Sequence, residues 1–373
     1  MDQKCTPDVV CIVSDCVMNF MENNHKKSFT VGDIWTSKYF IDNVKAIFNK
    51  PSATNPTTDS EYDKFIQQPL RMLAYAKVLN IQKIGNKNHY SIANYKILEY
   101  ISLKDKNAYH FLCTYLEKVL SDSGIYSYFE DYKKAYQKGV LSSTGFDKLK
   151  EKFQVLILEN TNINGIVEIN RIYPKILNIY ATQNSLPGTV RGFLSKNQFY
   201  YSDLMYNRPN WRDLEKNKNL SRQEAEADGL ISENPYSNYL IQKSMNVIRK
   251  LYNESEVKDE WSNGDATQIH HIFPKHEFPQ LAHYLENLIK LTPTQHYTKA
   301  HPKNKTSSIS IEYQLVCLLA KADNIEKSIK NNEIYYKKKS FIYCINTGLT
   351  KNLSNDLNFK EIKTELAVIY NDL

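Results

Sequence analysis

Long hydrophobic runs are missing from this sequence of 373 residues. A membrane-spanning helix needs roughly 18 consecutive apolar residues, and no stretch approaches that length. The N-terminal segment MDQKCTPDVVCIV lacks a basic segment before its apolar stretch, which Asp15 then interrupts. These absences argue against a membrane protein and a secreted protein. We therefore expect a cytoplasmic location and no membrane partner.

Cysteine is scarce, with six residues in the chain, and no two of them form a C-x-x-C pair. Paired cysteines would indicate a disulfide framework or a structural zinc site. Their absence predicts free thiols in a reducing compartment. The six are Cys5, Cys11, Cys16, Cys113, Cys317 and Cys344.

The sequence also lacks the motifs of an ATP-driven motor and of a methyltransferase. There is no G-x-x-x-x-G-K-[ST] phosphate-binding loop and no methyltransferase-like glycine motif. Positive charge is in only moderate excess, because 48 Lys and Arg against 41 Asp and Glu give a net charge of +7. That excess is compatible with a phosphate-rich partner but does not identify one.

What is present begins with an N-terminal pattern of helices followed by a hairpin. Apolar residues at helical spacing predict a first helix over residues 8–23, and a second follows it. Residues 59–78 predict a third helix. Alternating residues on both sides of the Gly85-Asn86 turn predict a β-hairpin over residues 81–92.

These elements, all within residues 1–95, resemble a winged helix. The resemblance implies that the third helix is a DNA recognition helix and that Lys83 and Lys87 on the hairpin contact phosphates. A small α+β domain used only for protein contacts is the alternative.

The central part of the chain divides into a connector and a second candidate surface. Residues 96–155 predict amphipathic helices that carry no chemistry. Residues 156–250 include cations interleaved with aromatic and amide side chains, which suits a nucleic-acid surface. We expect DNA contacts there from Arg191, Arg208 and Arg212. The alternative is a folded loop region whose aromatic side chains belong to the core.

Two short strands frame the stretch that carries chemistry. Residues 267–272 predict a strand that ends in two adjacent histidines, His270 and His271. Residues 288–291 predict a second apolar strand, which Asn287 precedes. A loop broken by prolines connects the two strands.

A helix should follow the second strand. Thr292 is a strong N-cap and Pro293 suits the first helical position. The helix therefore carries His296 and ends near His301, before Pro302.

The order strand, loop, strand, helix, with histidines and an asparagine at these spacings, resembles the HNH nuclease family and its ββα-metal motif over residues 265–301. The resemblance implies that His271 is the general base and that Asn287 bonds across the loop and orients this base. It also implies that His270 and His296 hold one divalent ion. We expect Mg²⁺ in the cell, with Mn²⁺, Ni²⁺ or Zn²⁺ as alternatives.

The sequence departs from the family pattern in two places. Many members have paired zinc-binding cysteines where this chain has Thr292 and Gln295, so the fold should depend on packing. Some branches place a third metal-binding histidine four residues after the helical one, whereas His301 follows His296 by five. On an α-helix this offset rotates His301 about 140° away. We therefore expect a capping or phosphate contact from His301 and leave a ligand role as the alternative.

The whole chain then resembles a stand-alone type II restriction endonuclease of the HNH class, which cuts double-stranded DNA at specific sites. Lys275, beside the histidine pair, would contact a phosphate. Such an enzyme implies a companion DNA methyltransferase, and a homodimer is left open. A modification-dependent HNH nuclease and a non-catalytic DNA-binding regulator are the alternatives.

The expected fold is α+β and predominantly helical. Its parts are a winged-helix-like domain over 1–95, a helical connector over 96–155, a DNA-contacting region over 156–250, the ββα-metal module over 251–305 and a helical C-terminal support over 306–373.

Overall fold

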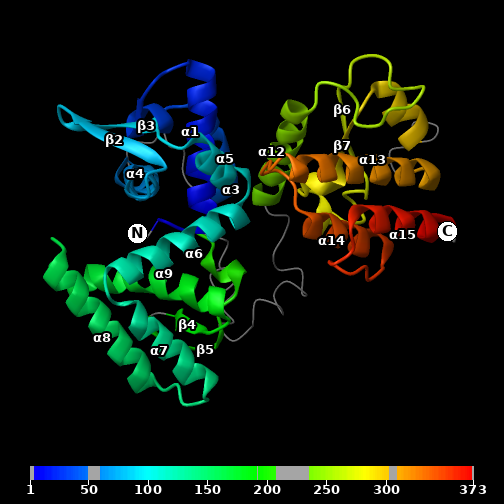
Figure 1. Ribbon diagram of the computed structural model, residues 1–373. Helices are drawn as coiled ribbons and strands as arrows, with labels where there is room; N and C mark the ends of the chain where they lie inside the picture. The colour runs from blue at the N-terminus through cyan, green and yellow to red at the C-terminus, as the bar shows by residue number, and fades with distance from the viewer. Residues whose placement is uncertain (1–3, 49–58, 191, 207–234, 302–308, 372–373) are drawn as a thin grey trace, which may run out of the picture. The chain divides into compact units, whose positions relative to one another are not determined.

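The computed structural model describes residues 4–48, 59–190, 192–206, 235–301 and 309–371. Contacts divide the chain into two compact units, Met1–Ser232 and Glu233–Leu373, which Figure 1 colours from blue to green and from green to red. The described residues are predominantly helical with short antiparallel sheets, which confirms the predicted α+β class. No helix among them is both long enough and apolar enough to cross a bilayer.

The first unit opens with helices that lead into a three-stranded antiparallel sheet of order β1-β3-β2. Gly85 adopts a positive φ of 59° at the turn between β2 and β3, as the predicted hairpin requires. The elements are α1 (Pro7–Asn24), β1 (Phe29–Thr30), α2 (Val31–Trp35), α3 (Lys38–Phe48), α4 (Asp59–Tyr75), β2 (Leu79–Ile84) and β3 (Lys87–Ile92).

Helix α1 is the centre of this unit because its apolar residues surround the axis. Val9, Val10, Ile12 and Val13 are all fully buried. A helix that is apolar on every side must be covered on every side. Helices α4, α5 and α6 supply much of that cover (Figure 1).

The remaining described residues of the first unit, 95–190 and 192–206, are mostly helical and include one hairpin. This agrees with the helices predicted for the connector. The elements are α5 (Tyr95–Leu103), α6 (Asp105–Asp122), α7 (Tyr126–Gln137), α8 (Ser143–Asn160), α9 (Ile166–Asn184), β4 (Pro187–Val190), β5 (Phe193–Gln198) and the short η2 (Tyr201–Leu204).

The second unit contains both predicted strands of the ββα stretch. Strands β6 and β7 pair antiparallel, with His271 opposite Leu288 and Gln268 opposite Leu291. The elements are α12 (Pro235–Leu251), β6 (Gln268–His271), η3 (Pro279–Leu281), η4 (Leu285–Asn287), β7 (Leu288–Leu291), the π-helix η5 (Gln295–Ala300), α13 (Ile311–Lys330), α14 (Lys338–Leu349) and α15 (Phe359–Asn371).

Helices enclose this hairpin within one apolar core. Helix α12 packs against β7, α13 against η5 and α15, and α14 against η4. The described residues from 311 to 371 are mostly helical, while a supporting role for them stays a prediction. Within α13, Tyr313 and Cys317 face the core, whereas Ile311 is 51% exposed.

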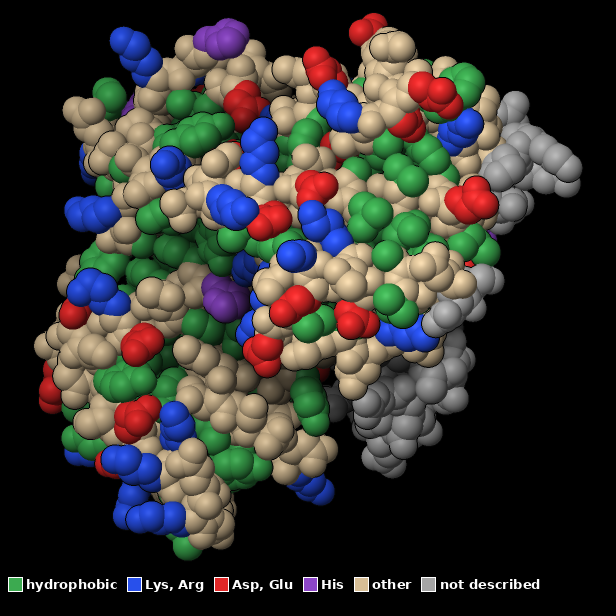
Figure 2. All heavy atoms as spheres, turned by 45° about the vertical axis from the view of Figure 1, so that its right-hand side comes forward, with side chains coloured by type: hydrophobic (Ala, Val, Ile, Leu, Met, Phe, Trp, Pro, Cys, Tyr) green, Lys and Arg blue, Asp and Glu red, His purple; other side chains and the backbone are tan. Residues whose placement is uncertain are grey.

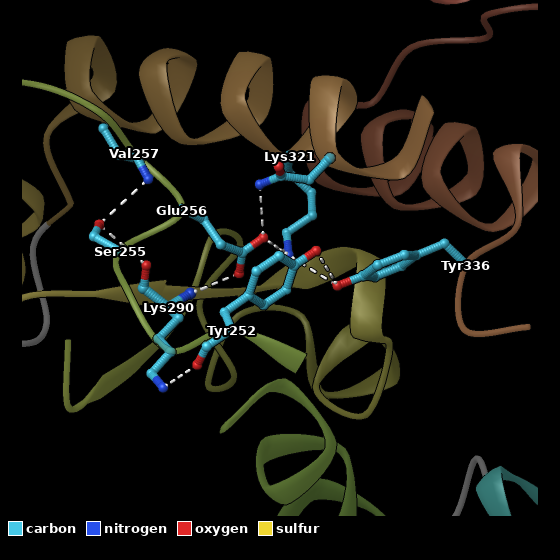
Figure 3. Close-up of polar contacts among 8 residues, drawn as sticks. Tyr252, Ser255, Glu256, Val257, Lys290, Lys321 and Tyr336 are labelled. Atoms are coloured by element: carbon cyan, nitrogen blue, oxygen red, sulfur yellow. Dashed lines mark hydrogen bonds and ion pairs between the residues drawn. The ribbon is translucent and has the colours of Figure 1, made fainter. Parts of the chain in front are cut away.

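A buried polar network closes the edge of β7 that does not pair with β6 (Figure 3). The Glu256 amide donates to the Lys290 carbonyl oxygen at 2.9 Å, and the Lys290 amide donates to Glu256 Oε1 at 2.8 Å. The fully buried Lys321 ammonium contacts Glu256 Oε2 at 2.5 Å. Strand β7 is therefore held along both edges, which fixes the hairpin that carries the histidines.

Candidate active site

The two adjacent histidines lie at the end of β6. His270 is almost completely buried, whereas His271 is only partly covered. Neighbouring residues of a strand point to opposite faces. Consequently the two rings leave the strand on different sides, which allows them to perform separate tasks.

Asn287 clamps the loop that follows β6. Its Oδ1 accepts from the Phe273 amide at 2.8 Å, and its Nδ2 donates to the carbonyl oxygens of Phe273 at 3.0 Å and Leu281 at 3.3 Å. The amide side chain is 1% exposed, so water does not compete for these bonds. These bonds cross the loop, while the role of Asn287 in orienting a general base stays a prediction.

His271 is oriented through the same loop. Its Nε2 lies 3.1 Å from the carbonyl oxygen of Ala282, the residue after Leu281. A carbonyl oxygen only accepts, so Nε2 carries the proton and Nδ1 keeps its lone pair. Burial lowers the pKa of His271, the Lys275 charge lowers it further, and the Ala282 contact opposes both. The ring is therefore neutral near pH 7 and able to accept a proton.

The predicted N-cap starts the third element of the motif. The Gln295 amide donates to Thr292 Oγ1 at 3.2 Å, and the Thr292 amide donates to Gln295 Oε1 at 3.0 Å. This reciprocal pair is a capping box. It positions the turn that carries His296 directly after β7.

The same two residues correct the prediction that packing alone replaces the missing zinc site. The fully buried Gln295 side chain also accepts from Ser255 Oγ at 2.6 Å and donates to Asp259 Oδ1 at 2.7 Å. Thr292 Oγ1 donates to the Trp261 carbonyl oxygen at 2.9 Å. Hydrogen bonds between these side chains and the preceding loop therefore stabilise the hairpin and the turn after it.

The helix after the cap is a π-helix, which overturns the expected geometry of His301. The His301 amide donates to the His296 carbonyl oxygen at 3.0 Å, a bond between residues five apart. Residues five apart therefore stack on one face of this turn, whereas an α-helix would separate them. The turn places His301, the C-cap residue of η5, beside His296, and its roles in capping, phosphate contact and metal binding stay predictions.

Three imidazoles meet in one small space. The ligand nitrogens of His270, His296 and His301 lie within 4.8 Å of one another. Metal–nitrogen bonds of about 2.1 Å in a tetrahedral site place two ligand nitrogens about 3.4 Å apart. The ring nitrogens would therefore need to approach one another by up to about 1.4 Å to share an ion. We call these three residues the trihistidine cluster.

The chemistry of the cluster fits a cation. Burial and the neighbouring imidazoles hold the pKa of His270 well below its usual range, and burial with His301 lowers the pKa of His296 to about 4. Both rings are therefore neutral at pH 7, the form that binds metals. Nδ1 of His296 is buried and has no hydrogen-bond partner. Such an orphaned acceptor is costly unless a ligand satisfies it.

The predicted DNA contacts divide into described and undescribed residues. Lys275 is exposed near His271, with Nζ 3.4 Å from Asn238 Oδ1. Lys83 and Lys87 are exposed on β2 and β3. In Figure 2, Lys and Arg side chains are spread among Asp and Glu side chains over the face shown. The remaining candidates, Arg191, Arg208 and Arg212, lie outside the described residues.

Sequence reasoning missed the side chains that flank the cluster. Tyr297 follows His296 directly, and its ring centroid lies 4.6 Å from that of His296. The Tyr297 hydroxyl donates to Oε1 of Gln268, which precedes His270 by two residues on β6. Tyr297 and Gln268 lie close in sequence to the predicted ligands His296 and His270, and this closeness could have identified them.

Comparison of the chain with family models, with curated proteins and with solved structures finds no match.

Proposed function

We propose that this chain is a metal-dependent endonuclease of the HNH type, and that it acts as a stand-alone type II restriction enzyme on double-stranded DNA. The observation that carries the proposal is the trihistidine cluster on the β6–β7–η5 motif beside a neutral, oriented His271. The Asn287 clamp supports it, because the clamp joins the two ends of the loop between the strands.

In the proposed mechanism, His270, His296 and His301 would hold one divalent ion. When bound, such an ion would supply stabilisation of the charge that develops on the phosphate and on the leaving 3′ oxygen. His271 Nδ1 accepts the proton of the attacking water, while the Ala282 carbonyl oxygen retains the proton on Nε2. Asn287 keeps that carbonyl in place through Leu281.

DNA recognition is assigned to the first part of the chain. The order α1, β1, α2–α3, α4, β2, β3 with sheet order β1-β3-β2 supports a winged-helix-like domain. In this interpretation α4 enters the major groove. Lys64, Arg71 and Tyr75 are exposed and share one helical face, while Lys83 and Lys87 follow on the hairpin. Lys275 contacts a phosphate near the cut.

The test is cleavage of supercoiled plasmid with Mg²⁺, Mn²⁺ or Zn²⁺, by the wild-type chain and by His271→Ala. Loss of a general base costs about 10²- to 10⁴-fold in rate, whereas DNA binding should persist because the base acts on water. His276→Ala is the matched control, since His276 is exposed and pairs only with Glu277.

Each outcome separates one alternative. Full activity in EDTA, or near wild-type activity of His271→Ala, would refute the mechanism. Binding without cleavage in any of the ions would favour a regulator. Cleavage of methylated plasmid alone would indicate a modification-dependent nuclease.

A further inference from the structure

Tyr297 occupies an unusual place for a large side chain beside a buried histidine cluster. It is 40% exposed, although its neighbours Gln295 and Ala300 on the same turn are buried. Its ring meets that of His296 at an interplanar angle of 88°. The ring therefore lies at the boundary between the cluster and solvent.

A hydrogen bond to Gln268 orients the hydroxyl group of Tyr297. It donates to Gln268 Oε1 at 3.3 Å, and Gln268 Nε2 donates to Thr267 Oγ1 at 3.1 Å. Gln268 and His270 lie on the same face of β6, because strand side chains alternate. The Tyr297–Gln268 pair is thus partly exposed on the side of the strand that carries a cluster histidine.

We propose that Tyr297 is a substrate-positioning residue whose hydroxyl, together with Gln268, contacts the sugar–phosphate backbone next to the phosphate at the trihistidine cluster. The inference rests on the proposed nuclease function. Tyr and Gln side chains commonly contact backbone oxygens, and they do so without reading bases. The contact is uncharged and releases no counterions, so it should change neither the salt dependence of binding nor the choice of site.

The experiment compares Tyr297→Phe, which keeps the ring, with Tyr297→Ala, which removes it. Cleavage of plasmid gives kcat and KM, calorimetric titration with Zn²⁺ gives metal affinity, and thermal melting checks the fold. Tyr128→Phe in the first unit is the control, because Tyr128 is 41% exposed.

We expect Tyr297→Phe to melt and bind Zn²⁺ as wild type does, but to lose about 10- to 100-fold in kcat/KM. The slope of log affinity against log salt should stay unchanged, whereas Lys275→Ala should lower it by about 0.9. Combining Gln268→Ala with Tyr297→Phe should add little to the loss, since the two residues act as one pair.

Two results would overturn the inference. In the first, Tyr297→Phe cleaves as well as wild type. In the second, cleavage falls only together with Zn²⁺ affinity, which would make Tyr297 a brace for His296. An inactive wild-type chain would instead remove the proposed nuclease function, so the two failures are distinguishable.

Discussion

At the scale of single residues, the candidate site is built from imidazole rings. Three buried or half-buried imidazoles form the cluster, and burial lowers the pKa of His270 and of His296. Imidazole ligands suit Zn²⁺ or Ni²⁺ better than Mg²⁺, which prefers oxygen donors. Because His301 adds a third imidazole to His270 and His296, the cluster favours a transition-metal ion more strongly than a site of two histidines would.

His301→Ala should weaken Zn²⁺ binding by more than the roughly 10-fold that loss of an outer hydrogen-bond partner costs a metal site. The reason is that one of three ligand rings disappears while His270 and His296 remain. Calorimetric titration measures the change, with His276→Ala as control. Equal affinities for wild type and His301→Ala would show that the His301 ring is not a ligand and would leave His301 with its backbone capping contact alone.

Asp8 provides a prediction that concerns stability alone. Burial, the largest cause, raises its pKa from 3.8 to about 6, although hydrogen bonds from Thr6 and from the Tyr206 amide oppose the shift. The folded state thus favours the protonated acid. The raised pKa of Asp8 contributes about 3 kcal/mol to the free energy of unfolding. This contribution is fully present below about pH 4 and is lost as the pH rises through about 6.

Asp8→Asn cannot titrate, so its free energy of unfolding relative to wild type should rise by about 3 kcal/mol from about pH 4 to about pH 7. Urea denaturation at the two pH values measures this difference. A difference that does not vary with pH would show that Asp8 titrates normally in the folded chain.

At the scale of elements, the loop after β6 is fixed from two sides. Asn287 holds the backbone of Phe273, and α14 covers its ring at Gly348. A Cβ atom built on Gly348 would lie 2.3 Å from Phe273 Cδ1. The helix can approach the loop this closely only because residue 348 lacks a side chain.

Gly348→Ala should therefore destabilise the second unit by about 1–3 kcal/mol through overpacking, and it should slow cleavage by shifting the loop that orients His271. Gly32→Ala is a matched control, because Gly32 is also helical and its new Cβ would meet only Thr30 Oγ1, at 3.7 Å. Thermal melting and plasmid cleavage provide the readouts. Indistinguishable melting of Gly348→Ala and Gly32→Ala would show that the Phe273 ring moves aside freely.

The elements also show how far the sequence could predict this site. Strand β7 and the Thr292 cap follow from local patterns, and the structure has them as expected. No sequence pattern of this kind predicts the π-turn. The same residues could form an α-helix, and the difference lies in the backbone hydrogen bond from the His301 amide to the His296 carbonyl oxygen. The contact of Glu256 with the second edge of β7 could not be predicted from the sequence either. Glu256 lies 34 residues before Lys290, and only folding brings its carboxylate to the strand.

At the scale of the whole molecule, the chain consists of two compact units, each described by itself. The trihistidine cluster lies entirely in the second unit, and the elements from α1 to β3 lie entirely in the first. The five predicted domains and a homodimer stay predictions. In the proposed function, site reading and strand cutting therefore belong to different units.

Replacing Lys83 and Lys87 together by alanine should lower the slope of log affinity against log salt by about 1.8, because two phosphate contacts are lost. The preferred cleavage site should not change, since phosphate contacts position the protein without specifying sequence. Binding titrations of the full chain at several salt concentrations and digestion patterns test both statements. Lys118→Ala removes an exposed charge on α6 as control. An unchanged slope would exclude the hairpin from the DNA interface.

The six cysteines are all buried and none forms a disulfide, so their reaction with a thiol reagent reports when the protein opens. A thiol reagent in solution can modify them only when a segment opens. Four of the thiols lie in the first unit, and Cys317 and Cys344 lie in the second. The order in which peptides containing these thiols become labelled would therefore record which unit opens first, without any added probe.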